Sequence, residues 1–446
     1  MTSEGFSILH SPPERGLVSI FKEFFLCRKN AQGKAGNIMS NKTIVVLATL
    51  DTKGTEARYV CEQIEQTGNK ALLIDTGVVG IPATRPDITR EEVAAAGGLE
   101  LHKILENPTR ELASPIMAEG ATRIVVDLVT KGQVHGVISL GGTQGTTLST
   151  KVMRALPYGF PKVMVSTIAS GNVAPWVDIK DITMMFSVTD ILGLNVVTRK
   201  ILANAAAAVS GMANTDVEIK HGAKPLVAVT TVGITTRGAM KAVETLEHAG
   251  YDTIVFHAIG PGGRAMEQMM REGLISAVLD YSTIEVSNEM FHALLAGGPD
   301  RLTTAGKLGL PQVICPGAIE VLVFNEPETV PSKYKSRTLI RHSPQITDVR
   351  LEKEEMVEVG KEIVRRLQHT KGKAVFLIPS LGFDSYSVKG QSFYDPEADA
   401  AFVAELKKGL SPNIKIVELN AAIDDPVFAT EAARMLIALM ESRTHS

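Results

Sequence analysis

The feature of the sequence that most constrains the fold is a repeated alternation of short apolar runs with amphipathic helices. Thr43 to Leu50, with the sequence TIVVLATL, has the length and β-branched content of a buried parallel strand. Thr55 to Thr67 follows with the residue spacing of a helix that packs on that strand. Strands that alternate with helices form parallel, doubly wound sheets, so we predict an α/β fold. The other elements expected in this half are strands at Lys70 to Thr76, Gly136 to Leu140, Lys162 to Thr167 and Ile182 to Val188, and a long helix from Met117 to Lys131.

The chain is long enough for two such domains. Its 446 residues exceed one ordinary hydrophobic core and fit two domains of roughly 200 residues each. An alanine-rich helix, Leu194 to Met212, precedes a polar stretch, Asn214 to Pro225, after which the alternation restarts. We therefore predict α/β domains with mainly parallel sheets over residues 41–213 and 225–441. Residues 1–40 are predicted to be a poorly ordered extension outside the fold.

The second half repeats the pattern of apolar runs and amphipathic stretches, and so predicts a second α/β domain. Its expected strands are Leu226 to Val232, Thr253 to His257, Ala277 to Asp280, Gln312 to Cys315, Ala374 to Pro379 and Lys415 to Leu419. Its expected helices are Lys241 to Ala249, Glu352 to Gln368, Glu397 to Lys407 and Val427 to Leu439.

Charge, cysteine content and hydropathy argue against several classes of function. The formal net charge of −3 gives no general attraction to nucleic acid. No apolar run approaches the roughly 20 residues that cross a bilayer, so we expect no membrane insertion. Cys27, Cys61 and Cys315 lie far apart and lack the paired spacing of a zinc site or a disulfide framework. We therefore expect a protein of the cytoplasm, without a metal site of its own.

Candidate binding residues in the first half follow the predicted strands. In an open parallel sheet, ligands bind outside the carboxyl ends of the strands. The residues found there are small, hydroxylated and rich in glycine, as a phosphate chain requires, because glycines let backbone N–H groups approach and hydroxyls donate hydrogen bonds. These residues are Asp51, Thr52 and Lys53, then Asp75 and Thr76, then Gly141 to Thr147 before a helix, and finally Ser166 and Thr167.

The loop from Gly141 to Thr147 matches no standard phosphate-binding motif. A Walker A loop needs a lysine at its end, and the dinucleotide fingerprint spaces its glycines differently. A structural alternative remains open for each loop, in which glycines only form tight turns and threonines only cap helices. The convergence of all the loops on one edge of the sheet favours the binding interpretation, with Lys53 supplying a positive charge.

The second half carries a different set of candidate ligands after its strands. An arginine at a helix start suits an anion, and carboxylates facing a histidine can transfer protons or hold a metal. A structural alternative also exists, because Asp395 before Pro396 has the pattern of a helix N-cap and Arg264 can form a local ion pair with Glu267. The candidates are His257, Gly262, Gly263, Arg264, Glu267, Asp280, Glu285 and Asp395.

Several of these segments together resemble a known family. From Lys42 to about Leu439 the chain is similar to the ATP-binding domain of the tomato mosaic virus resistance protein and its uncharacterised bacterial and fungal relatives. The motifs that carry the resemblance are LDTKG at Leu50 to Gly54, GGTQGT at Gly141 to Thr146, VSTIASG at Val165 to Gly171, GGRAME at Gly262 to Glu267 and FYDPEA at Phe393 to Ala398.

The resemblance implies two Rossmann-like domains, a homodimer, and ATP, with or without Mg²⁺, held by the first domain. It also implies a set of nucleotide-binding residues. By position these are Thr49, Asp51, Lys53, Thr76, Gly141, Gly142, Thr143, Gly145, Thr146, Ser166, Thr167 and Asp190.

Two hypotheses for the function follow. The first is an ATP-binding protein that uses the nucleotide in an enzymatic step on an unidentified small metabolite, at a cleft to which the second domain contributes. The second is a nucleotide-stabilised protein that binds partners and catalyses nothing. A nicotinamide-dependent oxidoreductase is disfavoured, because the dinucleotide fingerprint and its downstream acidic residue are missing.

Overall fold

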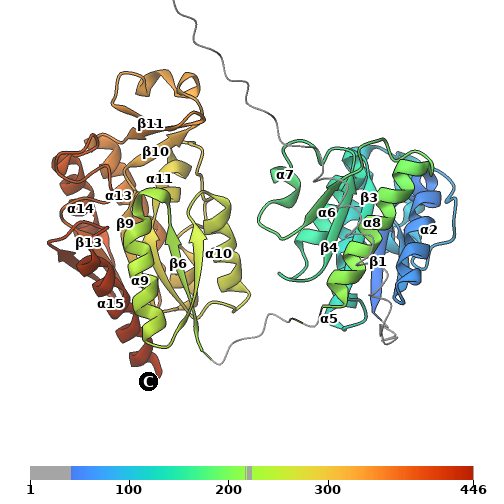
Figure 1. The fold of residues 1–446 in the computed structure, drawn as a ribbon, viewed down its shortest axis with the longest axis horizontal. Helices are drawn as coiled ribbons and strands as arrows, with labels where there is room; N and C mark the ends of the chain where they lie inside the picture. The colour runs from blue at the N-terminus through green and yellow to red at the C-terminus, as the bar shows by residue number, and fades with distance from the viewer. Residues whose placement is uncertain (1–41, 216, 218–223, 445–446) are drawn as a thin grey trace, which may run out of the picture. The chain divides into compact units, whose positions relative to one another are not determined.

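The structure of the protein is a computed structural model that describes residues 42–215, 217 and 224–444. The extension predicted for residues 1–40 lies outside the described residues. The chain divides into two compact units, each with its own sheet (Figure 1). Unit 1 contains the described chain up to Leu156, Phe160–Val173 and Ile182–Thr215, and unit 2 contains Pro157–Gly159, Ala174–Asp181 and the described chain beyond residue 216.

Unit 1 is built on a five-stranded sheet in the order β2-β1-β3-β4-β5, and every neighbouring pair in it is parallel. The strands are β1 (Thr43–Ala48), β2 (Lys70–Asp75), β3 (Gly136–Gly141), β4 (Lys162–Ser166) and β5 (Thr183–Phe186). The helices are α2 (Leu50–Gln66), α3 (Arg90–Ala96), α4 (Leu101–Glu106), α5 (Arg110–Thr130), α6 (Thr143–Arg154) and α8 (Val196–Ala213). This architecture confirms the α/β fold predicted for the first half.

The two faces of this sheet are covered because successive residues of each strand point to opposite sides. Ile44 and Val46 of β1 pack with Val60 of α2 and Leu202 of α8 in one apolar cluster. On the opposite face, α6 packs against β3, where the hydroxyl of Ser139 is 2.7 Å from that of Ser149. Burial of both faces explains why β1 reads as a continuous apolar run rather than an alternating one.

Unit 2 is built on a six-stranded sheet in the order β14-β13-β9-β8-β6-β7, again parallel throughout. Its strands are β6 (Leu226–Thr231), β7 (Asp252–His257), β8 (Ala277–Ser282), β9 (Gln312–Gly317), β13 (Ala374–Pro379) and β14 (Ile414–Leu419). Its longer helices are α9 (Thr236–His248), α10 (Pro261–Arg271), α13 (Lys353–Leu367), α14 (Pro396–Gly409) and α15 (Pro426–Thr444), and its short ones are α7 (Ala174–Val177), α11 (Ile284–Met290) and α12 (Thr304–Leu308). Two doubly wound domains are therefore confirmed.

A second sheet in unit 2 was not predicted. Strands β10 (Val321–Phe324), β12 (Ile346–Arg350) and β11 (Leu339–Ser343) form an antiparallel sheet in the order β10-β12-β11. It lies beyond one end of the six-stranded sheet (Figure 1). The strands are only four or five residues long, and β11 and β12 mix apolar with polar residues, so periodicity alone did not separate this sheet from a loop.

Several helices begin earlier than predicted. The helix expected from Met117 begins at Arg110, where the side chain of Thr109 accepts a hydrogen bond from the amide of Leu112. The helix expected from Thr55 begins at Leu50, directly after β1. Leu50 was predicted to belong to the strand before α2, and α5 begins with the charged pair Arg110 and Glu111, so the helical periodicity was recognised one or two turns late.

In both units the strand order reverses between two neighbouring strands, namely β1 and β3 in unit 1 and β6 and β8 in unit 2. Ligands of open α/β sheets bind outside the carboxyl ends of the strands at such switch points. No helix within the described residues combines the length and the apolarity needed to cross a bilayer.

Candidate functional site

A cavity of about 600 Å³ lies in unit 1 at the carboxyl ends of β1, β2 and β3. Its position is the switch point of this sheet, and its size is that of a small-molecule site. The walls come from the segments after the three strands and from the start of α5. The lining residues are Thr49, Asp51, Thr52, Lys53, Thr76, Gly77, Val78, Val79, Pro108, Thr109, Arg110, Ala113, Ser114, Met117, Gly141, Gly142, Thr143, Gln144, Gly145 and Leu148.

Most of the nucleotide-binding residues predicted from the sequence line this cavity. Those brought together there are Thr49, Asp51, Lys53, Thr76, Gly141, Gly142, Thr143 and Gly145.

The other predicted residues lie elsewhere. Thr146 and Ser166 are buried below the cavity floor, where their hydroxyl oxygens are 2.7 Å apart. Thr167 follows β4, and its amide donates a hydrogen bond to the carbonyl of Gly141 at 3.3 Å. Asp190 follows β5, is exposed and is not among the residues that line the cavity, although the carbonyl of its neighbour Ile191 accepts a hydrogen bond from Lys53. Thr146, Ser166 and Thr167 therefore support the glycine loop from beneath and beside it.

The glycine loop forms the start of α6. Gly142 is the N-cap residue of this helix, and no side chain caps the first-turn N–H groups. Gly142 has an ordinary extended conformation, with φ of −82°. A Cβ atom added to it would have only the Thr167 hydroxyl nearby, at 3.7 Å. The cavity wall here consists of open backbone N–H groups at the positive end of a helix, which is a site suited to an anion.

The segment after β1 supplies hydroxyl and charged groups to the same cavity. The hydroxyls of Thr49 and Thr52 are 3.0 Å apart, and a carboxylate oxygen of Asp51 accepts a hydrogen bond from the amide of Gly80 at 3.2 Å. The ammonium of Lys53 donates a hydrogen bond to the carbonyl of Ile191. Lys53 therefore lies on the cavity wall with one of its three donors already used.

Asp75 at the end of β2 fixes two cavity loops at once. Its Oδ1 atom accepts hydrogen bonds from the amide of Leu50 at 3.0 Å and the amide of Gly77 at 2.8 Å. Burial raises the pKa of this carboxyl group, and the two backbone amides oppose the rise. Asp75 is a positioning residue, because it holds the start of α2 against the loop after β2.

The start of α5 is the part of the cavity that the sequence analysis missed. Pro108, Thr109 and Arg110 line the cavity, and the exposed residue Arg110 adds a second cation to the lining besides Lys53. The signal was present as a threonine followed by charged residues, which is an N-cap pattern. It was not recognised because the helix was predicted to begin at Met117.

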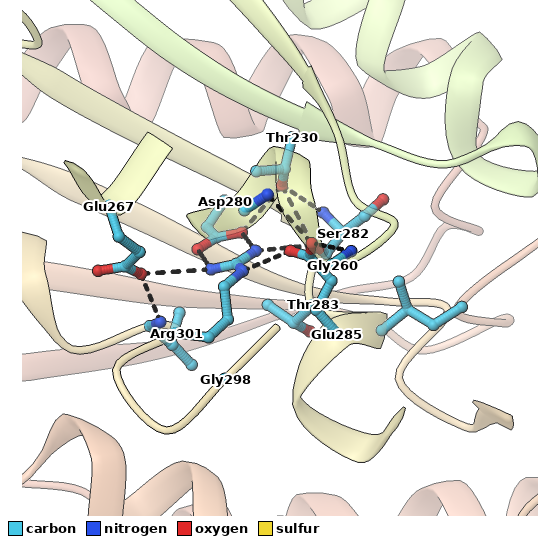
Figure 2. Close-up of polar contacts among 12 residues, drawn as sticks. Thr230, Gly260, Glu267, Asp280, Ser282, Thr283, Glu285, Gly298 and Arg301 are labelled. Atoms are coloured by element: carbon cyan, nitrogen blue, oxygen red, sulfur yellow. Dashed lines mark hydrogen bonds and ion pairs between the residues drawn. The ribbon is translucent and has the colours of Figure 1, made fainter. Parts of the chain in front are cut away.

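Three of the four acidic candidates of the second domain, Glu267, Asp280 and Glu285, surround the buried side chain of Arg301 (Figure 2). The guanidinium of Arg301 binds both oxygens of Asp280, at 2.5 and 2.6 Å, and its Nε donates to Glu285 at 2.6 Å. Glu267 lies 3.8 Å from the same guanidinium and accepts hydrogen bonds from the amides of Leu302 and Thr304. All four charged side chains are buried.

The cluster around Arg301 shifts the pKa values of its members. Burial would lower the pKa of Arg301, but the carboxylates of Asp280 and Glu285 raise it well above its ordinary value. Burial raises the pKa values of Glu267 and Glu285, and Arg301 opposes that rise. Perturbed pKa values of this kind occur in structural ion-pair networks as well as in active sites. The closed packing here indicates a structural role.

The remaining second-domain candidates have separate positions. A Cβ atom at Gly262 would collide with the carbonyl of His257, and one at Gly263 would collide with Glu285, so both glycines permit close packing of α10. Arg264 lies in the first turns of α10 and is partly exposed. Asp395 caps α14 by accepting a hydrogen bond from the amide of Ala398 at 3.0 Å.

Within the part of the chain that the structure describes, no group of three or more His, Cys, Asp or Glu side chains could hold a metal ion. The fold and the cavity together define a two-domain α/β protein with an anion-suited pocket at the switch point of its first sheet. The chain belongs to the uncharacterised protein family UPF0261, whose N-terminal domain matches residues 42–218 and whose C-terminal domain matches residues 224–440.

The relatives of the chain are bacterial and plant proteins. A UPF0261 protein of Clostridium tetani is 43% identical over 402 residues, which cover 90% of this chain and 100% of the relative. The ToMV resistance protein Tm-1(GCR237) of Solanum lycopersicum is 29% identical over 425 residues, covering 90% of this chain and 56% of that protein. These matches confirm the predicted family.

Among solved structures, a putative UDP-N-acetylglucosamine 2-epimerase from Listeria monocytogenes matches 62% of this chain and 79% of its own, with 9% identity and a TM-score of 0.22. A score this low carries no argument about function.

Proposed function

We propose that the first domain binds ATP in the cavity at the carboxyl ends of β1, β2 and β3. The observation that carries the proposal is the uncapped start of α6, where Gly142 to Gly145 present backbone N–H groups to the cavity. Phosphate groups are the ligands that such a helix start binds best. Lys53 and Arg110, which both line the cavity, add positive charge for a polyphosphate chain.

The other walls of the cavity suit the base of a nucleotide. Val78, Val79, Met117 and Leu148 supply apolar surface to the lining. Val79 has 66% of its surface exposed, so its side chain is accessible to a planar ligand in the cavity. The lining thus combines polar groups for the phosphates with aliphatic surface for the base of ATP.

Magnesium would be bound chiefly by the phosphates of the nucleotide. Asp51 is the only carboxylate among the residues that line the cavity, and one carboxylate with substrate phosphates is a common set of ligands for Mg²⁺. As the carboxylate of the lining, Asp51 is also suited to orient an attacking group beside the γ-phosphate.

A thermal-shift panel tests the binding proposal. ATP at roughly 100 times its dissociation constant stabilises a protein by about 2.7 kcal/mol through mass action. We expect an upward shift with ATP and ADP and a smaller one with GTP and NAD, using protein shown by mass spectrometry to carry no bound nucleotide. If neither ATP nor any other adenine nucleotide raises the unfolding midpoint, the proposal is refuted.

Phosphate release separates the enzyme from the non-catalytic binding protein. If the chain is an ATP-dependent enzyme acting on a small metabolite, release should be measurable and should fall in Asp51→Asn while ATP still binds. Saturable ATP binding without release, in the presence of a panel of candidate metabolites, would assign the nucleotide-stabilised binding protein instead.

A further inference from the structure

A second cavity, of about 520 Å³, lies entirely within unit 2 and is independent of the proposed nucleotide site. Its walls come from the segments after β6, β7 and β8 and from the small antiparallel sheet. It therefore lies at the switch point of the six-stranded sheet, where α/β domains bind ligands.

The walls of this cavity are almost entirely aliphatic. Ile234, Ile284, Leu295, Val321 and Val323 are members of one apolar cluster and line it from below. Ile259 and Leu294, with 38% and 43% of their surfaces exposed, lie on the same wall. Aliphatic side chains that are exposed and grouped around a pocket indicate that an apolar ligand covers them.

The polar groups of the cavity are two imidazoles and one carboxylate. The Nδ1 atom of His257 is 3.3 Å from the carbonyl oxygen of Thr231. Because a carbonyl oxygen only accepts hydrogen bonds, Nδ1 must carry the proton, and the Nε2 atom of neutral His257 is then an acceptor. Nε2 makes no hydrogen bond to any residue that the structure describes, so it is available to a ligand that donates.

His342 lies on the same cavity wall and is held by two neighbours. Its Nδ1 atom is 3.0 Å from the hydroxyl of Tyr386 and 3.8 Å from a carboxylate oxygen of Asp348. Its Nε2 atom likewise has no partner among the described residues. A hydroxyl group satisfies either tautomer of His342, because a hydroxyl both donates and accepts.

The charge of the lining excludes strong anion binding. Asp348, which is buried, is the only carboxylate among the described lining residues, and no lysine or arginine accompanies it. A ligand carboxylate or phosphate would lose its hydration on entering a pocket with aliphatic walls, and it would be repelled by the carboxylate of Asp348. An amine would have to compete with His342 for Asp348.

From these contacts we infer that unit 2 binds a neutral aliphatic alcohol, with its hydrocarbon part against Ile284 and Leu294 and its hydroxyl group at His257 and His342. This assignment adds a second ligand site to the protein and does not rest on ATP binding by the first domain.

Four probes of equal chain length test the chemistry of the ligand. Methyl NMR of isoleucine-labelled full-length protein follows Ile234, Ile259 and Ile284 during titration with 1-octanol, 1-methoxyheptane, octanoate and octylammonium. We expect 1-octanol to bind at least about 5-fold more tightly than the ether and at least about 10-fold more tightly than either ion. Equal binding of the ether, or tighter binding of an ion, would overturn the inference.

Matched variants test the location of the site. Leu294→Glu should weaken 1-octanol binding at least about 10-fold, whereas Leu308→Glu should leave it unchanged. Leu308 is a suitable control because it is an equally exposed leucine of the same unit, at 47%, outside the cavity lining. His257→Leu should remove most of the preference for the alcohol over the ether while the isoleucine signals still respond. Loss of affinity in both leucine variants, or in neither, would contradict this site.

Discussion

The carboxylate of Asp75 at the end of β2 accepts a hydrogen bond from the amide of Leu50 at the start of α2, at 3.0 Å. This contact joins the loop after β1 to the loop after β2, and both loops line the cavity of the first domain. The geometry of the cavity therefore depends on a buried residue that no ligand would touch.

Replacement of Asp75 should affect both stability and binding. Asp75→Ala leaves the buried amides of Leu50 and Gly77 without an acceptor, which should cost roughly 1 to 3 kcal/mol in the free energy of unfolding. The ATP affinity should fall as well, because the two loops lose their connection. Asp75→Asn keeps an oxygen acceptor and should recover most of both losses in urea denaturation and in nucleotide titration. Equal losses in the two variants would show that the negative charge matters more than the hydrogen bonds.

Arg110 at the start of α5 should contribute to phosphate binding alone. Arg110→Ala should lower the affinity for ATP by about 10-fold, which corresponds to about 1.4 kcal/mol of binding free energy. The affinity for adenosine should stay unchanged. Arg123→Ala is the control, since Arg123 lies on the same helix in an exposed pair with Glu119 and outside the cavity. Calorimetric titration of both ligands into the three proteins measures the difference. A parallel loss of adenosine binding in Arg110→Ala would refute the phosphate role.

The buried cluster around Arg301 should be a major source of stability in the second domain. Arg301→Met leaves Asp280, Glu285 and Glu267 buried without their cation, and we expect a loss of about 3 to 5 kcal/mol in urea denaturation. Arg271→Met breaks only the exposed pair with Asp300 and should cost less than about 1 kcal/mol. A small effect of Arg301→Met would mean that the carboxyl groups are protonated or hydrated rather than paired.

A second buried group of charges should make stability depend on pH. Burial raises the pKa of Glu320 to about 8, with Asp384 adding to the rise, and burial raises the pKa of Asp384 to about 6. Both values exceed those of the unfolded chain, so the folded protein holds protons that the unfolded chain has released. The contribution of these two carboxyl groups to the free energy of unfolding should therefore be fully present below about pH 4 and be lost as the pH rises to about 8.

Glu320→Gln tests this dependence, because the amide stays neutral at every pH. In this variant the free energy of unfolding should fall much less as the pH rises. At pH 8.5 it should exceed that of the unchanged protein by at least about 1 kcal/mol. Glu358→Gln on the exposed surface should follow the original curve, as its side chain is 60% exposed. Parallel curves for all three proteins would show that Glu320 does not titrate in this range.

The sequence predicted those features that local patterns encode. The alternation of apolar runs with helices identified both parallel sheets but not the small antiparallel one. The loops after β1 and β3 were correctly predicted to lie together, because parallel strands end on one edge. The start of α5 was missed, since a polar first turn carries no apolar period. Arg301 was missed as well, because nothing in its local sequence indicates that three acidic residues from distant strands and helices will surround it.

The central claim is that the glycine loop at the start of α6 binds the phosphates of ATP. Calorimetric titration of ATP into Gly142→Val and into the unchanged protein tests it most directly. Gly142 has an ordinary φ of −82° and open space around its Cβ position, so the substitution should not disturb folding. Its side chain would nevertheless occupy the entrance to the N–H groups of α6 and keep phosphate away. Gly211→Val, on a helix with open space at the same position, is the control for the added bulk.

We predict one ATP bound per chain in the unchanged protein and in Gly211→Val, and a loss of more than about 30-fold in affinity in Gly142→Val, which is about 2 kcal/mol. Circular-dichroism melts of the three proteins should show closely similar midpoints. Wild-type ATP affinity in folded Gly142→Val would remove the glycine loop from the site, and the absence of ATP binding by the unchanged protein would contradict the account as a whole.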